Sequence, residues 1–569
     1  MELSVTPFPR KPVFHLTIMT RILLLLLALI SPLSAAEDIR LAAQGRLLLL
    51  VPQDAPPLGG IRVSAGHAIP AQWEKDQATR ERMTEVMFPI RWWRWEEISL
   101  HFTPAHDGTV DLQLNGPWSQ KQGMPVSRQE VLWDGIDAEG AVIHNGGFEE
   151  VTGNDPVGWN SPVAPAANRD AWPLANVKAL QGTGMAATWS QRPLVQKIEV
   201  KAGREVRLRL HARASTLPGF VEPKRLGPDT PAHRAMARIR RGVSLGNCWD
   251  ADPKRRPVQY TLEDIDHVAN EGFDHIRMPV AWHFHLRPKN GGFEIDPAFL
   301  AELEPFMKRA LERKLHIMLD WHHFRDLTED PAAHKNRFIA GWELIARHFQ
   351  SWPPELFFEP LNEPCHALTT ELANPIYQEV IATIRKTNPE RILLISPGHW
   401  GNVNELDQLR LPDDDDRLVG TFHSYEPFYF THQGASWSGL SELKGVLYPG
   451  PPETPLELHE SLRDHQGVSP FIANYNTQPA ESNPSSPRGI KAALDTARAW
   501  SDHFGRPSHL GEFGTHESAD LASRERFLRD MRTFAEERGI PWTLWQWRSA
   551  MGYWDADNKR PKFRDSLFE

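Results

Sequence analysis

The chain has few cysteines, no excess of basic residues and no long hydrophobic run, and each absence excludes a class of protein. Two cysteines among 569 residues cannot form the disulfide framework of a small secreted scaffold. A formal net charge of −10 argues against binding to nucleic acid, which requires a basic surface. The longest apolar run, residues 22–30, is shorter than the about 20 residues that span a bilayer.

The amino terminus nevertheless has the pattern of an export signal. Arg21 precedes the apolar run, and small residues follow as far as Ala36, as they do before a signal-peptidase cleavage site. We therefore expect residues 1–36 to be a signal peptide, the protein to be secreted or periplasmic, and no membrane attachment to remain after cleavage. A start at Met19 would give this signal a more usual length.

Residues 37–217 read as a smaller all-β domain. Apolar and polar residues alternate at 97–102 and at 206–210, and turn-forming residues separate such runs, as in a β-sandwich. The second half resembles the jelly-roll carbohydrate-binding modules of polysaccharide hydrolases in three motifs: NGGFE at 145–149, PVGW at 156–159 and VKAGR at 200–204. Trp93 and Trp95 would share one strand face, either as a sugar-stacking platform or as part of the sandwich core.

Residues 218–231 are rich in proline and glycine and are interpreted as a linker. In residues 232–569, short apolar strands alternate with helical patterns, which is typical of βα units. Eight strands are expected at 241–246, 273–279, 315–322, 355–362, 391–396, 418–425, 508–512 and 542–547. This number predicts a (β/α)₈ TIM barrel; a doubly wound sheet is the alternative, but no glycine-rich phosphate loop follows the first strand.

Polar and aromatic residues gather at the carboxyl ends of these strands, where a barrel places its active site. They are Asn247, Arg277, His322, His323, Asn362, Glu363, His423, Tyr425, Glu512, Trp545 and Trp547. Cys248 and Cys365 follow the first and fourth strands, on opposite sides of such a barrel, so we expect two free thiols. By strand alternation, Glu359 would face away from Asn362 and serve as a structural carboxylate.

Glu363 and Glu512 provide two carboxyl groups across the barrel mouth without metal-ligand spacing, which suits cleavage of a glycosidic bond. That reaction needs one protonated carboxyl group as the acid and one ionised carboxylate as the nucleophile. Arg277 and Tyr425 are expected to keep Glu512 ionised and oriented, which leaves Glu363 to carry the proton.

The barrel resembles glycoside hydrolase family 5, the cellulase family. The resemblance is carried by four motifs: RGVSLGN at 241–247, WHH at 321–323, NEP at 362–364 and GEFG at 511–514. It implies a (β/α)₈ fold, a retaining mechanism and no catalytic cofactor or metal. By motif, it assigns Glu363 as acid/base and Glu512 as nucleophile, with supporting roles for Arg277, His322, Asn362, His423, Tyr425 and Trp545.

Several alternatives stay open. The substrate is expected to be a polysaccharide or oligosaccharide, either a β-1,4-glucan or mannan and other β-glycans, and the protein a monomer. A non-catalytic glycan-binding protein on the same scaffold, or a metal-dependent hydrolase using His322, His323 and His283 or His285, is a different reading. The long aromatic segment 426–504 is expected to shape substrate binding, and either Trp545 or Trp547 could be the sugar platform.

Overall fold

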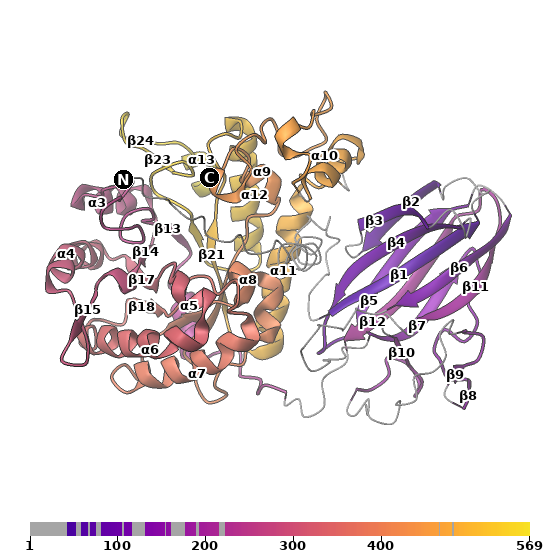
Figure 1. Ribbon diagram of the computed structural model, residues 1–569, viewed down its shortest axis with the longest axis horizontal. Coiled ribbons are helices and arrows are strands. Elements are labelled where there is room, and N and C mark those ends of the chain that lie inside the picture. The colour runs from indigo at the N-terminus through magenta and orange to yellow at the C-terminus, as the bar shows by residue number, and fades with distance from the viewer. Residues whose placement is uncertain are drawn as a thin grey trace, which may run out of the picture.

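A computed structural model of the chain describes residues 43–52, 59–65, 69–75, 81–104, 107–115, 131–153, 155–160, 177–188, 193–214, 222–465, 467–480 and 483–569. Its two parts are a barrel and two β-sheets that lie beside it (Figure 1). The predicted signal peptide and the first residues of the predicted linker lie outside the described residues.

The carboxyl-terminal part is a closed barrel of eight parallel strands, as predicted. The strands follow one another around the barrel in chain order: β13 (Arg241–Ser244), β14 (His275–Val280), β17 (His316–Trp321), β18 (Leu356–Glu359), β19 (Leu393–Ile395), β20 (Leu418–His423), β21 (Ser508–Phe513) and β22 (Trp542–Leu544). Pairing of β13 with β22 closes the ring, with Gly242 beside Thr543. Each predicted strand corresponds to one of these elements, and β14 and β17 to β22 are buried almost throughout.

Helices surround the barrel (Figure 1). They are α2 (Pro231–Met236), α3 (Leu262–Glu271), α4 (Pro297–Glu312), α5 (Arg325–Glu329), α6 (Pro331–His348), α7 (Thr370–Arg385), α8 (Gly398–Gly401), α9 (Phe428–Thr431), α10 (Val468–Thr477), α11 (Pro487–Phe504), α12 (Leu521–Glu537) and α13 (Arg564–Phe568). In α11, Ile490, Leu494, Ala497 and Trp500 recur at helical spacing and are buried, which explains how this polar sequence forms a packed helix. It ends at Gly505, whose φ of 64° suits a residue without a side chain.

Short elements complete the barrel part. They are the 3₁₀ helices η2 (Trp282–Phe284), η3 (Val403–Gln408), η4 (Ser436–Ser438) and η5 (Glu460–Leu462), and the strand pairs β15 (Leu286–Lys289) with β16 (Gly292–Ile295) and β23 (Trp554–Asp555) with β24 (Arg560–Pro561).

The amino-terminal part contains two five-stranded antiparallel sheets. One has the order β11 (Leu194–Val200), β6 (Gly108–Asn115), β1 (Ala43–Pro52), β4 (Glu81–Ile90), β3 (Ile69–Lys75); the other has β10 (Ala186–Thr188), β7 (Val131–Glu139), β12 (Val206–Ala214), β5 (Glu96–Thr103), β2 (Gly59–Ala65). β8 (Val151–Thr152) and β9 (Asp155–Pro156) form a small separate pair. The strands predicted from alternation correspond to β5 and β12, and in β12 Val206, Leu208 and Leu210 are buried.

Trp93 and Trp95 do not share a strand face, so this prediction is wrong. Both precede β5 in irregular chain. The Trp93 ring stacks on His503 of α11 with ring centres 4.2 Å apart, so it packs against the barrel. Trp92 donates from its indole nitrogen to the Asp407 carbonyl at 3.4 Å, and buried Arg91 forms an ion pair with Asp407 at 3.7 Å. We call Arg91, Trp92 and Trp93 the docking segment.

The described part of the predicted linker also lies against the barrel. The Leu226 amide donates to the Phe504 carbonyl at 3.0 Å, and the Lys224 amide donates to Asp413 at 3.0 Å. A side chain at Gly505 would collide with the Leu226 carbonyl oxygen, because its Cβ would lie 2.0 Å away. Residues 222–231 therefore run along the barrel surface in fixed contact with it.

Cys248 and Cys365 are both free, which confirms the prediction of two thiols. Among the described residues, no helix is both long enough and apolar enough to cross a membrane.

Candidate active site

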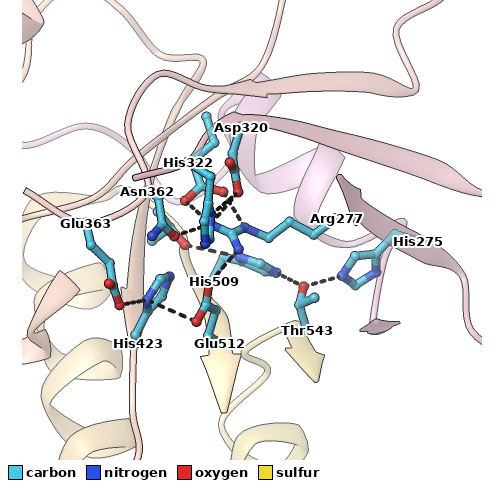
Figure 2. Close-up of polar contacts among 12 residues, drawn as sticks. His275, Arg277, Asp320, His322, Asn362, Glu363, His423, His509, Glu512 and Thr543 are labelled. Atoms are coloured by element: carbon cyan, nitrogen blue, oxygen red, sulfur yellow. Dashed lines mark hydrogen bonds and ion pairs between the residues drawn. The ribbon is translucent and has the colours of Figure 1, made fainter. Parts of the chain in front are cut away.

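Glu363 and Glu512 meet at the carboxyl ends of the barrel strands, with His423 between them (Figure 2). Glu363 follows β18, Glu512 lies near the end of β21, and His423 ends β20. His423 Nδ1 is 2.7 Å from Glu363 Oε1 and 3.7 Å from Glu512 Oε2. One carboxylate oxygen of each glutamate and a nitrogen of His423 lie within 4.8 Å of one another. The structure thus brings together the two carboxyl groups that the sequence singled out.

Arg277 of β14 is buried completely and holds the Glu512 side of the site. Its Nη1 donates to Glu512 Oε1 at 2.7 Å, and its Nη2 donates to Asn362 Oδ1 at 2.5 Å. Tyr425 donates its hydroxyl proton to Glu512 Oε2 at 2.9 Å. Both oxygens of Glu512 therefore accept hydrogen bonds that fix the orientation of the carboxylate, as the sequence predicted for Arg277 and Tyr425.

Two further carboxyl groups contact Arg277, and sequence reasoning missed their place in the site. Glu359 accepts from Arg277 Nε at 2.8 Å and from Nη2 at 3.0 Å, and Asp320 Oδ2 is 2.6 Å from Nη2. The expectation that Glu359 faces away from Asn362 is wrong, because both side chains contact the same guanidinium group. Asp320 lies two positions before His322, and residues two apart in a strand point to the same face. A charged residue at this position of an apolar strand was therefore the feature of the sequence that could have placed Asp320 in the site.

The contacts of Arg277 predict a large effect on stability. We expect Arg277→Met to lower the free energy of unfolding by about 3–5 kcal/mol, because it leaves buried carboxyl groups without their cation. Burial already raises the pKa of Asp320 to about 7, and it raises the pKa of Glu359. Carboxyl groups whose pKa is higher in the folded protein favour folding at low pH, so the loss should grow as the pH rises through neutrality.

Urea unfolding of the variant and the parent protein, at an acid and a slightly alkaline pH, measures this loss. Arg347→Met, on the exposed face of α6, is the matched control and should change stability little. Equal stability of Arg277→Met and the parent at the higher pH would contradict the prediction.

Asn362 accepts from Arg277, and Trp545 follows β22 at the same end of the barrel. The Asn362 side chain is buried, and its Nδ2 has no hydrogen-bond partner among the described residues. The ring of Trp545 lies parallel to that of His322, with centres 5.3 Å apart and planes within 1°. Gly246 makes room for this ring, because a Cβ there would lie 2.5 Å from it. A free amide donor next to Glu363 and a flat aromatic ring stacked on His322 therefore lie at the end of the barrel that carries the carboxyl pair.

The structure places the other predicted residues in different settings. Trp547 is not a platform: it is buried, stacks on Trp554 with ring centres 4.9 Å apart, and donates to Asp264 at 3.0 Å. His322 is buried, with Nδ1 3.3 Å from Asp320. His323 is exposed, with its ring centre 4.0 Å from that of His322. Asn247 follows β13 with a φ of 64° and a half-buried side chain.

A chain of hydrogen bonds that the sequence did not suggest crosses the barrel interior near Arg277 (Figure 2). Thr543 Oγ1 lies 2.9 Å from His275 Nε2 and 3.1 Å from His509 Nε2. The other ring nitrogen of His509 is 3.3 Å from Thr421 Oγ1. Burial lowers the pKa of His509 well below its usual range, so the His509 ring adds no positive charge near Arg277 at neutral pH.

The surroundings of the two glutamates give their carboxyl groups different pKa values. Burial raises the pKa of Glu363 to about 8, and the Glu359 and Asp320 charges add to the increase, while Arg277 opposes it. Burial also raises the pKa of Glu512, to about 7, but His423, Arg277 and the hydrogen bond from Tyr425 limit the increase. Glu363 therefore keeps its proton to a higher pH than Glu512 does.

The histidine set considered for a metal-dependent hydrolase does not converge. His283 stacks on Phe324 and His285 on Phe299, with ring centres 5.1 and 3.5 Å apart. Within the described residues, the one group of three metal-ligating side chains that converge is Glu363, His423 and Glu512. The geometry therefore does not support a metal-dependent hydrolase that uses these histidines.

Comparison with known families decides the identity of this barrel. A family model described as cellulase (glycosyl hydrolase family 5) matches residues 244–551, which is more than half of the chain. The chain belongs to glycosyl hydrolase family 5. Both Glu363 and Glu512, and every residue that contacts them, lie within the matched part of the family.

Several curated proteins similar to this chain carry the name endoglucanase. Endoglucanase H of Acetivibrio thermocellus is 27% identical over 336 residues, which cover 58% of this chain and 31% of that protein. Endoglucanase 3 of Fibrobacter succinogenes is 26% identical over 352 residues, covering 57% of this chain and 52% of that protein. The chain thus spans about a third and about half of these two relatives. Endoglucanase C of A. thermocellus is 29% identical over 334 residues, which cover 92% of its length.

Solved structures of the family support the same fold. Endoglucanase Cel5A from Thermotoga maritima is 28% identical, and the match covers 60% of this chain and all of that chain, with a TM-score of 0.51. Structures of that enzyme have been determined with cellobiose and with mannotriose. The (β/α)₈ barrel predicted for this chain is confirmed.

Segment 426–504 differs from the sequence interpretation in part. Its last 18 residues form α11, one of the helices that surround the family 5 barrel, and the described part of residues 426–486 contains the short helices α9, η4, η5 and α10. Most of its aromatic residues are buried: Tyr429, Phe430, Tyr448 and Tyr475. Trp437, in contrast, is 63% exposed, with its ring centre 5.3 Å from that of His516. Most of the aromatic residues in this segment therefore serve to fold it.

Proposed function

We propose that this chain is a retaining endoglucanase that cleaves β-1,4-linked glucan by double displacement, with Glu363 as acid/base and Glu512 as nucleophile. The observation that carries the proposal is the close approach of the two carboxyl groups, whose oxygens lie within 4.8 Å on either side of His423. Retaining glycosidases hold their carboxyl groups about 5–5.5 Å apart, whereas inverting enzymes need roughly 6.5–9.5 Å to admit water.

The first step combines proton donation and attack. Glu363 gives its proton to the glycosidic oxygen as that bond breaks, and Glu512 attacks the anomeric carbon to form a glycosyl ester. Arg277 and Tyr425 hold Glu512 by its two oxygens and favour its ionised form. In the second step, ionised Glu363 takes a proton from water, and the resulting attack releases Glu512.

Asn362 and Trp545 are proposed to hold the sugar that is cleaved. The free Nδ2 of Asn362 would donate to the sugar 2-hydroxyl, and this contact becomes stronger as positive charge develops on the sugar ring. Trp545 would stack under the apolar face of the same sugar. His423, through Nδ1, keeps the proton-carrying oxygen of Glu363 near the glycosidic bond.

The pKa order of the two glutamates predicts a bell-shaped pH profile. Activity needs Glu512 ionised, so kcat/KM should fall as the pH decreases below about 7. It also needs Glu363 protonated, so kcat/KM should fall as the pH increases above about 8. Initial rates on a soluble cellodextrin, measured from acid to alkaline pH, test this profile. Activity that stays constant into the alkaline range would contradict Glu363 as the acid.

A substrate panel tests the proposed function. Soluble β-glucan, mannan, xylan and xyloglucan are incubated with the full chain, product sizes are followed with time, and the anomer released first is identified by NMR. We expect fastest cleavage of β-1,4-glucan, internal cuts and a β-anomer as first product. The relatives named above are all endoglucanases, which favours glucan over mannan. Binding without release of reducing sugar would show a non-catalytic glycan-binding protein, and an α-anomer would show inversion.

Export and the role of the two-sheet part are proposals too. We propose that the protein leaves the cytoplasm through the signal at residues 1–36 and acts as a monomer. The two antiparallel sheets are compatible with a carbohydrate-binding jelly roll. Amino-terminal sequencing of the mature protein tests the first proposal, and its elution volume in size-exclusion chromatography tests the second.

A further inference from the structure

We propose that Glu363, His423 and Glu512 form a binding site for a divalent transition-metal cation such as Zn²⁺, and that a bound cation inhibits the enzyme reversibly. The inhibition rests on the proposed function, because it requires that these glutamates carry out the reaction. The binding itself rests on geometry alone: one ligand atom from each of the three side chains lies within 4.8 Å of the others.

The distances are close to those of a zinc site. Bonds of about 2.0–2.2 Å in a tetrahedral arrangement place ligand atoms roughly 3.3–3.6 Å apart. His423 Nδ1 is 2.7 Å from the Glu363 oxygen, which is shorter than this spacing, and 3.7 Å from the Glu512 oxygen, which is close to it. The three ligand atoms lie within 4.8 Å of one another, so side-chain rotations that bring the two carboxylates closer together would complete three ligands, and water would be the fourth. The Glu363 side chain is 17% exposed, which gives a cation access from solvent.

The charges around the site favour a cation. Asp320, Glu359 and Glu512 all contact Arg277, and Glu363 joins them through His423. In the described part of the chain, Arg277 pairs with three of these four carboxyl groups, and no other guanidinium or ammonium group forms an ion pair with any of them. A divalent cation would supply the positive charge that the carboxyl groups lack.

The ligand types select the class of metal. One imidazole nitrogen with two carboxylate oxygens suits Zn²⁺ and similar transition metals, whereas Mg²⁺ and Ca²⁺ prefer oxygen ligands alone. Arg277 donates to Glu512 Oε1 and Tyr425 donates to Oε2, the oxygen that faces His423, and such outer contacts orient a ligating carboxylate. A cation here would occupy the oxygens that give the proton and attack the sugar, so it should compete with substrate.

The test uses the full chain after dialysis against EDTA. Titration with ZnCl₂ in a calorimeter should show one site, and Co²⁺ in its place should give the visible absorption of a tetrahedral complex. Zn²⁺ should raise the apparent KM for a soluble cellodextrin without changing kcat, MgCl₂ at the same concentration should have little effect, and EDTA should restore activity. Zinc inhibition that lowers kcat at unchanged KM would overturn the competitive site.

Variants locate the site. His423→Gln should weaken Co²⁺ and Zn²⁺ binding by at least roughly 10- to 100-fold. His348→Gln, an exposed residue of α6, is the matched control and should bind both metals as the parent does. Absence of binding to the parent, or equal binding by His423→Gln, would overturn the proposal. Hydrolysis by the metal-free enzyme tests the proposed function separately, because the Co²⁺ spectrum does not depend on turnover.

Discussion

Glu512→Gln is expected to abolish turnover while the protein stays folded. The amide cannot form the glycosyl ester, and loss of a covalent nucleophile should lower kcat by roughly 10⁴- to 10⁶-fold. The fold should survive, because the amide oxygen of glutamine can still accept the hydrogen bond from Arg277 or from Tyr425. Reducing-sugar release from soluble β-glucan measures the loss, and thermal unfolding confirms that the variant is folded.

The matched control is Glu371→Gln, an exposed carboxylate in the first turn of α7 that should leave kcat unchanged. A second variant, Glu512→Ala, tests the chemistry itself. With azide present, the small anion should attack from the vacated side and yield a glycosyl azide of inverted configuration. Residual hydrolysis by Glu512→Gln above about a hundredth of the parent rate would assign the nucleophile elsewhere.

Glu363→Gln should lower kcat by an amount that depends on the leaving group. For a sugar leaving group, loss of the proton donor should reduce kcat roughly 10²- to 10⁴-fold. For an aryl cellobioside with an acidic phenol, the first step needs little protonation, so its rate should fall far less. Pre-steady-state release of the phenol from the two proteins measures that first step directly.

The pH profile of the same variant provides an independent check. Since Glu363 is assigned to the alkaline limb, that limb should disappear in Glu363→Gln for the aryl substrate. Equal losses of rate on sugar and aryl leaving groups would contradict the role of Glu363 as the acid. Retention of the alkaline limb would assign that titration to a group other than Glu363.

The barrel could be predicted because its strands are short, apolar and almost completely buried, and because parallel strands direct their carboxyl ends to one face. The sequence therefore predicts that residues at those ends, such as Glu363, Arg277 and His423, lie in one site. Glu359 was placed on the wrong side because the strand was expected to continue to Asn362. β18 ends at Glu359, so the alternation no longer applied beyond it.

Other details depend on contacts that no local pattern records. Trp545 and Trp547 both follow β22, and the choice between them is made by Asp264 and Trp554, which hold Trp547 in the core. The sugar-stacking interpretation of Trp93 failed because its ring partner, His503, lies about 400 residues further along the chain. Asp320 was not among the predicted site residues because it lies inside β17, whereas the prediction selected residues at the ends of strands.

The docking segment has a consequence for how this protein denatures. Arg91 and Asp407 are both buried where the two-sheet part contacts the barrel, and separating them would expose an unpaired charge on each side. Stacking of Trp93 on His503 and the bond from Leu226 to Phe504 add to the same contact. Calorimetry should therefore record a single cooperative melting peak for the whole chain, in place of the two independent peaks that modules joined by a free tether would give.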